Sequence, residues 1–251
     1  MVVWGHYDKD DGKAVHQLGI ELASVDGYYL EDLLNDIGSR NKVSDTARGT
    51  KSISIVSEKM ISDLEKYGVV PQKTNKVSLK NVLEKVPSEY HNLVLLGYFE
   101  GNGHLSKEGS TNELDISTGS YEMANDIFNL LGEVVGQENL KLIHQDNCHR
   151  VRIYKEKTIT DALTYLYTGS DLDRALKRKF LMACEKSETV NSIRAKWLLD
   201  KARESSFVLP EKVLDKVWAT FFMSRYLDDL RESYIKLIMS GITQERLPPK
   251  E

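Results

Sequence analysis

The chain contains an internal repeat, and this feature constrains its fold more than any other. Residues 55–67 match residues 153–165 at a spacing of 98 residues, with identity at six of nine compared positions. Farther upstream the spacing falls, to 94 residues for Glu21 with Asp115 and to 92 residues for Gly5 with Gly97. Insertions in loops explain this drift, because loops tolerate changes in length better than helices and strands do. The repeat predicts two halves of similar structure.

The hydrophobic pattern predicts the same order of elements in each half: helix, two strands, helix, two strands, helix. Alternating apolar residues predict strands at 16–24, 52–56 and 149–154. Amphipathic helices are predicted at 28–37 and 121–131, each ended by a glycine, Gly38 or Gly132. The predicted fold class is α+β, with a first repeat at 1–70, a connector at 71–87, a second repeat at 88–185 and a helical extension at 186–251.

The composition is that of a soluble globular protein. The chain has 251 residues, of which 41% are hydrophobic and 29% charged, and it has only five prolines, which excludes collagen and disordered tails. Apolar runs such as 93–96 are far shorter than a membrane span of about 20 residues, so we expect a cytoplasmic protein without a membrane partner. The two cysteines, Cys148 and Cys184, do not form a disulfide framework or a zinc pattern.

Charge is unevenly distributed along the chain. Residues 1–173 carry a balance of −9 and residues 174–251 a balance of +5, which together give the net −4. A basic cluster opens the second part, formed by Arg174, Lys177, Arg178 and Lys179. Two interpretations of this cluster stay open, a phosphate-binding site or a solvated helix face.

The last part of the chain is helical in character. From Ser187 onward apolar residues recur at three- and four-residue steps, for example at Leu214, Val217, Trp218 and Phe221. Such a segment either packs on the body of the protein or presents a helix to a partner.

The segment 87–103 is the most informative for function. Pro87 marks a boundary and Ser88 is a potential cap for a helix that Gly101 and Gly103 close. Glycine inside a helix costs about 1 kcal/mol relative to alanine. Gly97 therefore indicates a place where another backbone approaches closely, and the repeat offers Gly5 as its partner.

These residues carry a resemblance to a known family. Residues 95–103, Leu-Leu-Gly-Tyr-Phe-Glu-Gly-Asn-Gly, resemble the LAGLIDADG motif of homing endonucleases, and residues 3–10 resemble a degenerate copy. Residues 57–74 are similar to the family's strand-to-helix ending and connector, and Tyr165–Tyr167 with Arg178 and Lys179 are similar to its closing segment. The resemblance covers residues 1 to about 185 and agrees with the duplication that single-chain members have.

The resemblance implies a fold and a chemistry. It implies two pseudo-symmetric αββαββα domains whose saddle-shaped antiparallel sheets straddle double-stranded DNA, in a monomer with pseudo-two-fold symmetry. It implies hydrolysis of phosphodiester bonds with Mg²⁺, for which Mn²⁺ or Ca²⁺ can substitute, held by the acids near the ends of the two motifs. Carried onto this sequence, those positions are Asp10 and Asn102, and Glu100, Lys73 and Lys155 are further catalytic candidates.

Strand residues and nearby cations are expected to contact the DNA. The candidates are Lys13, His16, Arg40, Lys42, Arg48 and Lys51 in the first half and Lys107, Lys141, His144, Arg150 and Arg152 in the second. The negative balance of residues 1–173 opposes this expectation, because phosphate neutralisation supplies most non-specific affinity for DNA.

Two functions therefore stay open. The first is a site-specific DNA endonuclease. The second is a protein on the same scaffold that binds DNA or intron RNA without cleaving it, as a transcriptional regulator or a maturase does. Asn102 favours the second, because an amide brings no negative charge to a metal. We expect either protein to be cytoplasmic, associated with a nucleoid in a bacterial or phage setting, or organellar.

Overall fold

The structure is a computed structural model that describes residues 2–7, 14–69, 78–106 and 112–204. The chain divides into two compact units, residues 1–187 and residues 188–251. The first unit contains both repeats. The described part of the second unit is one helix, α8 (Glu188–Glu204). Among the described residues, no helix has the length and apolar character needed to cross a membrane.

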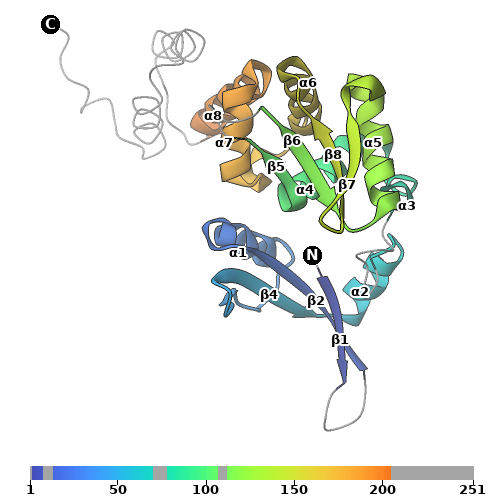
Figure 1. The fold of residues 1–251 in the computed structure, drawn as a ribbon. Helices are drawn as coiled ribbons and strands as arrows, with labels where there is room; N and C mark the ends of the chain where they lie inside the picture. Colours follow the sequence, from blue (N-terminus) through green and yellow to red (C-terminus); the bar gives the residue numbers. More distant parts are fainter. Residues whose placement is uncertain (1, 8–13, 70–77, 107–111, 205–251) are drawn as a thin grey trace, which may run out of the picture. The chain divides into compact units, whose positions relative to one another are not determined.

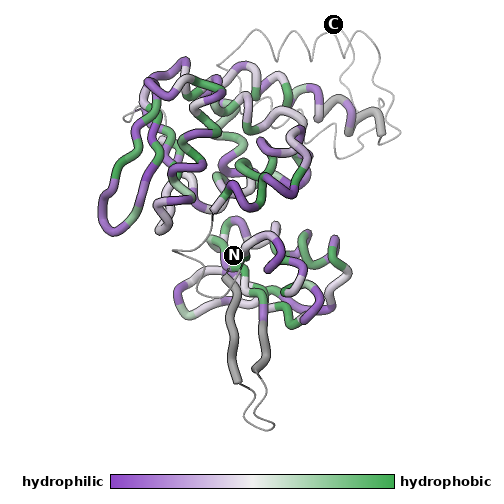
Figure 2. The backbone as a smooth tube through the Cα atoms, turned by 90° about the vertical axis from the view of Figure 1, so that its right-hand side faces the viewer, coloured by the Kyte–Doolittle hydropathy of each residue, from purple (hydrophilic) through white to green (hydrophobic). Residues whose placement is uncertain are grey.

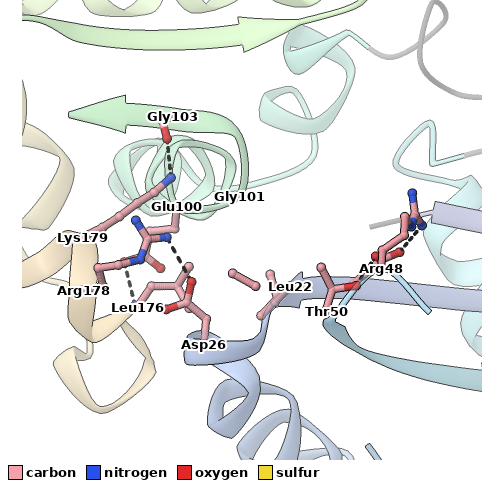
Figure 3. A pocket seen from close by; sticks show the side chains of 12 residues that line it. Leu22, Asp26, Arg48, Thr50, Glu100, Gly101, Gly103, Leu176, Arg178 and Lys179 are labelled. Carbon is pink, nitrogen blue, oxygen red and sulfur yellow. Dashed lines mark hydrogen bonds and ion pairs between the residues drawn. The ribbon is translucent and has the colours of Figure 1, made fainter. Parts of the chain in front are cut away.

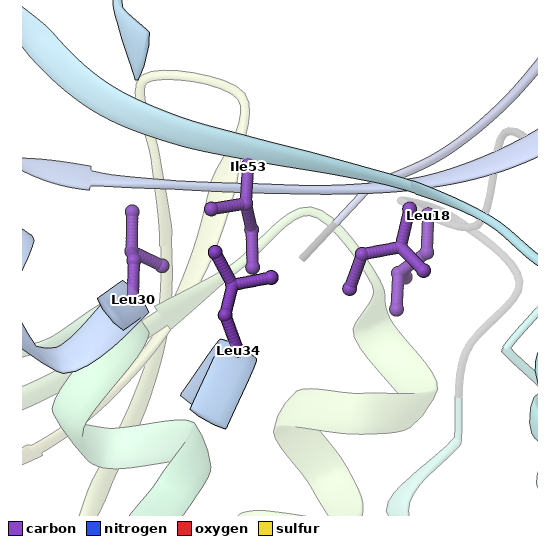
Figure 4. Close-up of a cluster of buried hydrophobic side chains, with 5 residues drawn as sticks. Leu18, Leu30, Leu34 and Ile53 are labelled. Carbon is purple, nitrogen blue, oxygen red and sulfur yellow. The ribbon is translucent and has the colours of Figure 1, made fainter. Parts of the chain in front are cut away.

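The first repeat forms an antiparallel sheet, sheet A, with strand order β1-β2-β4-β3 (Figure 1). Its strands are β1 (Val2–Tyr7), β2 (Ala14–Ala23), β3 (Ser44–Asp45) and β4 (Thr50–Val56). Its helices are α1 (Gly27–Asp36), between β2 and β3, and α2 (Glu58–Glu65), after β4. One face of the sheet packs on α1 through a hydrophobic core (Figure 4), formed by Leu18, Leu30, Leu34, Ile53 and Ile55.

The second repeat forms sheet B with the equivalent order, β5-β6-β8-β7. Its strands are β5 (Gly103–Leu105), β6 (Leu114–Thr118), β7 (Lys141–Gln145) and β8 (Cys148–Ile153). Its helices are α4 (His91–Asn102), α5 (Tyr121–Val135) and α6 (Glu156–Tyr167), with α3 (Leu79–Leu83) before them and α7 (Lys177–Lys186) after them. Helix α5 packs on β6, β7 and β8, and α4 packs on β6 and α6. Hydrophobic residues recur along the elements of both repeats (Figure 2).

The predicted α+β class with two similar antiparallel sheets is confirmed. The helix positions also agree closely, and Ser57 and Ser120 each accept a hydrogen bond from a backbone N–H three residues later. The predicted cap Ser88 is wrong, because α4 begins at His91 after Tyr90 and has no side-chain cap. One predicted stop is wrong. Helix α5 continues past Gly132 and ends before Gly136, which has a φ of 82° that favours glycine.

The strand register corrects the alignment of the two repeats. Leu18 lies opposite Ile55 in sheet A, and Leu114 lies opposite Ile153 in sheet B. Since Ile55 and Ile153 are equivalent, Leu18 is equivalent to Leu114, at a spacing of 96 rather than 94 residues. The two-residue error leaves each side chain on the same face, because strand side chains alternate with a period of two.

The same register shows that residues 3–10 were matched to the wrong element. Val3 lies opposite Leu18, as Leu105 lies opposite Leu114, so strand β1 is equivalent to β5 and not to helix α4. Val2–Tyr7 is a strand, and residues 8–10 lie outside the described residues. The expected pairing of Gly5 with Gly97 is therefore wrong. Among the described residues, no atom lies within 4 Å of where a Cβ on Gly97 would be.

Candidate nucleic-acid interface

The end of helix α4 is held by buried polar contacts (Figure 3). Glu100 is 7% exposed, and its Oε1 accepts a hydrogen bond of 2.9 Å from the backbone N–H of Leu176. Lys179 is 6% exposed, and its Nζ donates to the carbonyl oxygens of Phe99, at 2.8 Å, and Gly103. The Phe99 carbonyl also accepts from the backbone N–H of Gly103, so Lys179 is a second donor to it, from α7, and a donor to the carbonyl just past the helix end.

Gly103 allows the tight exit from α4 into β5. A Cβ at this position would lie 2.5 Å from the carbonyl oxygen of Phe99 and closer still to its ring. The glycine that the backbone requires in this segment is therefore Gly103, not Gly97.

Burial shifts the pKa values of both charged groups at this helix end. Desolvation is the largest cause of the rise in the pKa of Glu100 to about 7, against the smaller lowering effects of the Leu176 N–H and Lys179. Desolvation is likewise the largest cause of the fall in the pKa of Lys179 to about 8, with Arg178 adding to it. These groups face an open cavity of about 470 Å³ that Asp26, Arg178 and Glu21 also line.

Asn102 lies apart from this buried cluster. It is exposed, and its backbone carbonyl accepts a hydrogen bond of 3.2 Å from the Ser117 hydroxyl. Residues two positions apart in a helix lie about 200° apart around its axis. Glu100, expected as a further catalytic residue, therefore does not lie beside Asn102, since it faces Leu176 and the buried side of α4.

The donors present do not fit Mg²⁺. Asn102 offers one neutral amide oxygen, whereas Mg²⁺ is usually bound through one or two carboxylates. Among the described residues, no group of three or more His, Cys, Asp or Glu side chains could hold a metal ion. Of the other expected catalytic residues, Lys155 is described and does not complete a site. Lys155 is exposed and donates to the Oδ1 of Asn139 at 2.7 Å, and Asp10 and Lys73 lie outside the described residues.

Sheet B presents a polar face on the side opposite to α5. Directly opposed residues in an antiparallel pair point to the same side of a sheet. Asp115 is opposite Arg152, Arg152 is opposite Lys141, and Ser117 is opposite Arg150, so these five side chains share one face. Leu114, Ile116 and Val151 are buried on the other face. Three predicted DNA contacts, Lys141, Arg150 and Arg152, are thus brought together.

His144, another candidate of the second half, is not part of this face. His144 is opposite His149, and the two rings lie 4.5 Å apart on the side of the sheet that faces α5. Successive residues of a strand point to opposite faces. His144, three residues after Lys141, therefore lies on the other face of the sheet. Lys107 lies outside the described residues.

The first-half candidates are dispersed. Lys51 lies on the α1 side of sheet A, where it pairs with Asp45 at 2.7 Å and its side chain fills the space beside Gly27, so its predicted place on the polar face is wrong. Arg48 pairs with Glu21 at 2.8 Å, and Arg40 and Lys42 are exposed in the loop before β3. His16 lies in β2 opposite Gly5, and Lys13 lies outside the described residues.

The polar face of sheet A carries groups that the sequence reasoning missed. Gln17, Ser52, Ser54 and Thr50 lie on it, together with Glu21. The Ser54 hydroxyl donates to the Oε1 of Gln17 at 2.8 Å, and the Thr50 hydroxyl donates to Glu21. Their alternation along β2 and β4 could have indicated this face, but the expected DNA contacts were cations, and these residues carry hydroxyl and amide groups. The two sheets therefore differ: sheet A is rich in neutral hydrogen-bonding groups and sheet B in arginine.

The basic cluster after α6 contacts acids of the first repeat. Arg174 pairs with Asp36 at 2.7 Å, and Arg178 pairs with the buried carboxylate of Asp26 at 3.1 Å. The Lys177 ammonium lies 4.4 Å from the centre of the Tyr28 ring. Arg174, Lys177 and Arg178 are exposed, as a solvated face would have them, and their side chains also connect the two repeats.

Comparisons with known proteins agree with this architecture. No protein-family model matches the sequence, and a search of curated proteins finds no match. The chain is similar in structure to the LAGLIDADG homing endonuclease I-SmaMI bound to cleaved DNA, with 11% sequence identity, 98% of this chain and 93% of that chain covered, and a TM-score of 0.50. It is also similar to the LAGLIDADG meganuclease I-AabMI bound to uncleaved DNA, with 12% identity, 97% and 95% coverage, and a TM-score of 0.47. The chain has a LAGLIDADG-type fold.

Proposed function

We propose that this protein binds a specific site in double-stranded DNA through the polar faces of its two sheets. The observation that carries the proposal is the gathering of Lys141, Arg150 and Arg152 on one face of sheet B, opposite to its helices. Strands can enter the major groove, where each base pair presents its own pattern of donors and acceptors. The likeness to DNA-bound endonucleases of the same fold supports double-stranded DNA as the partner.

The negative charge before residue 174 bears on how this binding works. Residues 1–173 carry a net −9, and the arginines of sheet B are paired with Asp115 and Glu113. Attraction to phosphates is therefore weak, and contacts with base edges must supply a larger share of the affinity. Because the faces of sheets A and B differ, we expect a non-palindromic target.

A charge reversal at the edge of sheet B tests the proposal. Lys141→Glu is expected to weaken binding to a duplex DNA by about tenfold at low salt, because it replaces an attraction for phosphate with a repulsion. Lys157→Glu is the matched control, since Lys157 is exposed on α6, away from the polar face. Binding is measured by fluorescence anisotropy, with a double-stranded RNA of the same sequence as competitor. Equal losses for the two variants, or a preference for the RNA, would contradict the proposal.

Metal-dependent DNA cleavage is a second candidate function, which the resemblance of residues 95–103 to the LAGLIDADG motif favours and Asn102 opposes. The exposed position that the motif gives to an acid is occupied by Asn102, so we expect the chain as it stands to leave DNA intact in Mg²⁺. Asn102→Asp restores a carboxylate there and is expected to produce nicks in a supercoiled plasmid, measured on a gel with and without EDTA. Nicking by the unaltered protein would contradict our proposal of binding without cleavage. Absence of nicking by both proteins would dismiss the endonuclease.

A further inference from the structure

Two arginines of sheet B share one buried carboxylate. The side chain of Asp115 is 4% exposed, and its Oδ2 accepts hydrogen bonds from Nη1 of Arg150 at 3.0 Å and from Nε of Arg152 at 2.9 Å. A carboxylate that is buried in this way fixes the side chains that bind it, because charge-assisted hydrogen bonds are strong and directional. Both guanidinium groups are therefore oriented before any ligand arrives.

The two arginines differ in which of their N–H groups have hydrogen-bond partners within the protein. Arg152 is 16% exposed, and it also contacts Glu113, at 3.3 Å, and the Oε1 of Gln145, at 3.4 Å. Arg150 is 29% exposed, and among the described residues its Nη2 has no hydrogen-bond partner. Its Nε is buried without a partner, which is costly unless the arrangement serves another purpose. Arg152 thus has a partner at each of its three nitrogens, whereas Nη2 of Arg150 keeps its donors available among the described residues.

We infer that Arg150 reads a guanine in the half of the DNA site that sheet B covers, and that Asp115 is its positioning residue. The inference rests on the proposed function and adds the base and the residue that selects it. Guanine presents two adjacent acceptors, O6 and N7, in the major groove, and the planar guanidinium matches them with two parallel donors. Fixing the arginine beforehand lowers the entropy that is lost on binding. If Arg150 contacted a phosphate instead, its contribution would be independent of the DNA sequence. Base recognition and phosphate contact can therefore be told apart by measuring base preference.

Selection from a randomised duplex library tests the inference. The unaltered protein is expected to select guanine at one position of one half-site. Arg150→Lys is expected to reduce that preference by about tenfold and to leave the other positions unchanged, since each bidentate contact supplies about 1–3 kcal/mol of discrimination. Arg150→Gln is expected to shift the preference toward adenine, whose N6 and N7 suit an amide. Asp115→Asn is expected to weaken the guanine preference at the same position, with folding checked by circular dichroism.

Lys157→Gln is the control, since Lys157 is exposed on α6, and it is expected to keep the guanine preference. A uniform loss of affinity in Arg150→Lys with the base preference intact would overturn the inference in favour of a phosphate contact. Equal loss of preference in the Arg150 and Lys157 variants would overturn it as well. In both cases the unaltered protein still binds DNA and the proposed function stands. Failure of the unaltered protein to select any sequence would overturn the proposed function itself.

Discussion

Lys179→Met is expected to lower the free energy of unfolding by about 3 kcal/mol. The Lys179 ammonium is buried and donates to the carbonyl oxygens of Phe99 and Gly103, and a hydrogen bond that involves a charged group contributes about 1.5–3 kcal/mol. Methionine fills much of the same space but donates nothing, so the end of α4 loses its donor from α7. The change also removes the positive charge that faces Glu100. Urea denaturation followed by circular dichroism measures the effect.

Lys177→Met is the control for this prediction. Lys177 lies on the same helix and is exposed, and its ammonium lies over the Tyr28 ring. The hydrogen bond from its backbone N–H to the Tyr28 hydroxyl does not depend on the side chain. Exposed cation–π contacts contribute about 0.5–1 kcal/mol, so a loss of at most about 1 kcal/mol is expected. Similar losses for the two variants would show that Lys179 does not anchor the end of α4.

The stability of the protein is expected to fall by about 2 kcal/mol between pH 5 and pH 7 relative to that of Glu100→Gln. Burial raises the pKa of Glu100 from 4.5 to about 7. Between these two values the folded chain keeps a proton that the unfolded chain releases, so this contribution is fully present below pH 4.5 and is lost as the pH rises toward 7. Glutamine mimics the protonated acid at every pH and removes the dependence.

Urea denaturation of both proteins at several pH values measures this difference. The comparison with the variant cancels the contributions of histidines and other groups to the pH dependence, because these groups titrate in both proteins. Parallel pH profiles for the two proteins would contradict the raised pKa of Glu100 and its burial against Leu176.

The sequence was sufficient to predict the parts of the fold that depend on local pattern. Helices α1, α2, α5 and α6 follow from apolar periodicity and from caps such as Ser57 and Ser120. Strands β2, β4 and β8 follow from alternation, and the repeat implied two halves of similar structure. Residues 3–10 were aligned with the motif of residues 95–103 on a few identical residues around a glycine. Such short matches do not distinguish a helix from a strand. Only the register of β1 against β2 showed that residues 2–7 belong to a strand.

The candidate site was predicted less well, because it depends on which residues meet across the sheets. Arg150 and Arg152 were found as cations, but their shared partner Asp115 lies more than thirty residues away and carried no local signal. Lys51 and His144 were misplaced because a strand residue's face depends on its exact register. The pairing of Arg178 with Asp26 joins residues 152 positions apart, which the charge of a single segment cannot reveal.

The most direct test of the central claim is a selection of bound and cut molecules, recovered separately, from a randomised double-stranded DNA library in low salt with Mg²⁺. The account predicts that the unaltered protein enriches one non-palindromic sequence in the bound fraction and yields no cut ends. Enrichment of cut ends would contradict the claim of binding without cleavage, and recovery of no enriched sequence would contradict site-specific DNA binding by this fold.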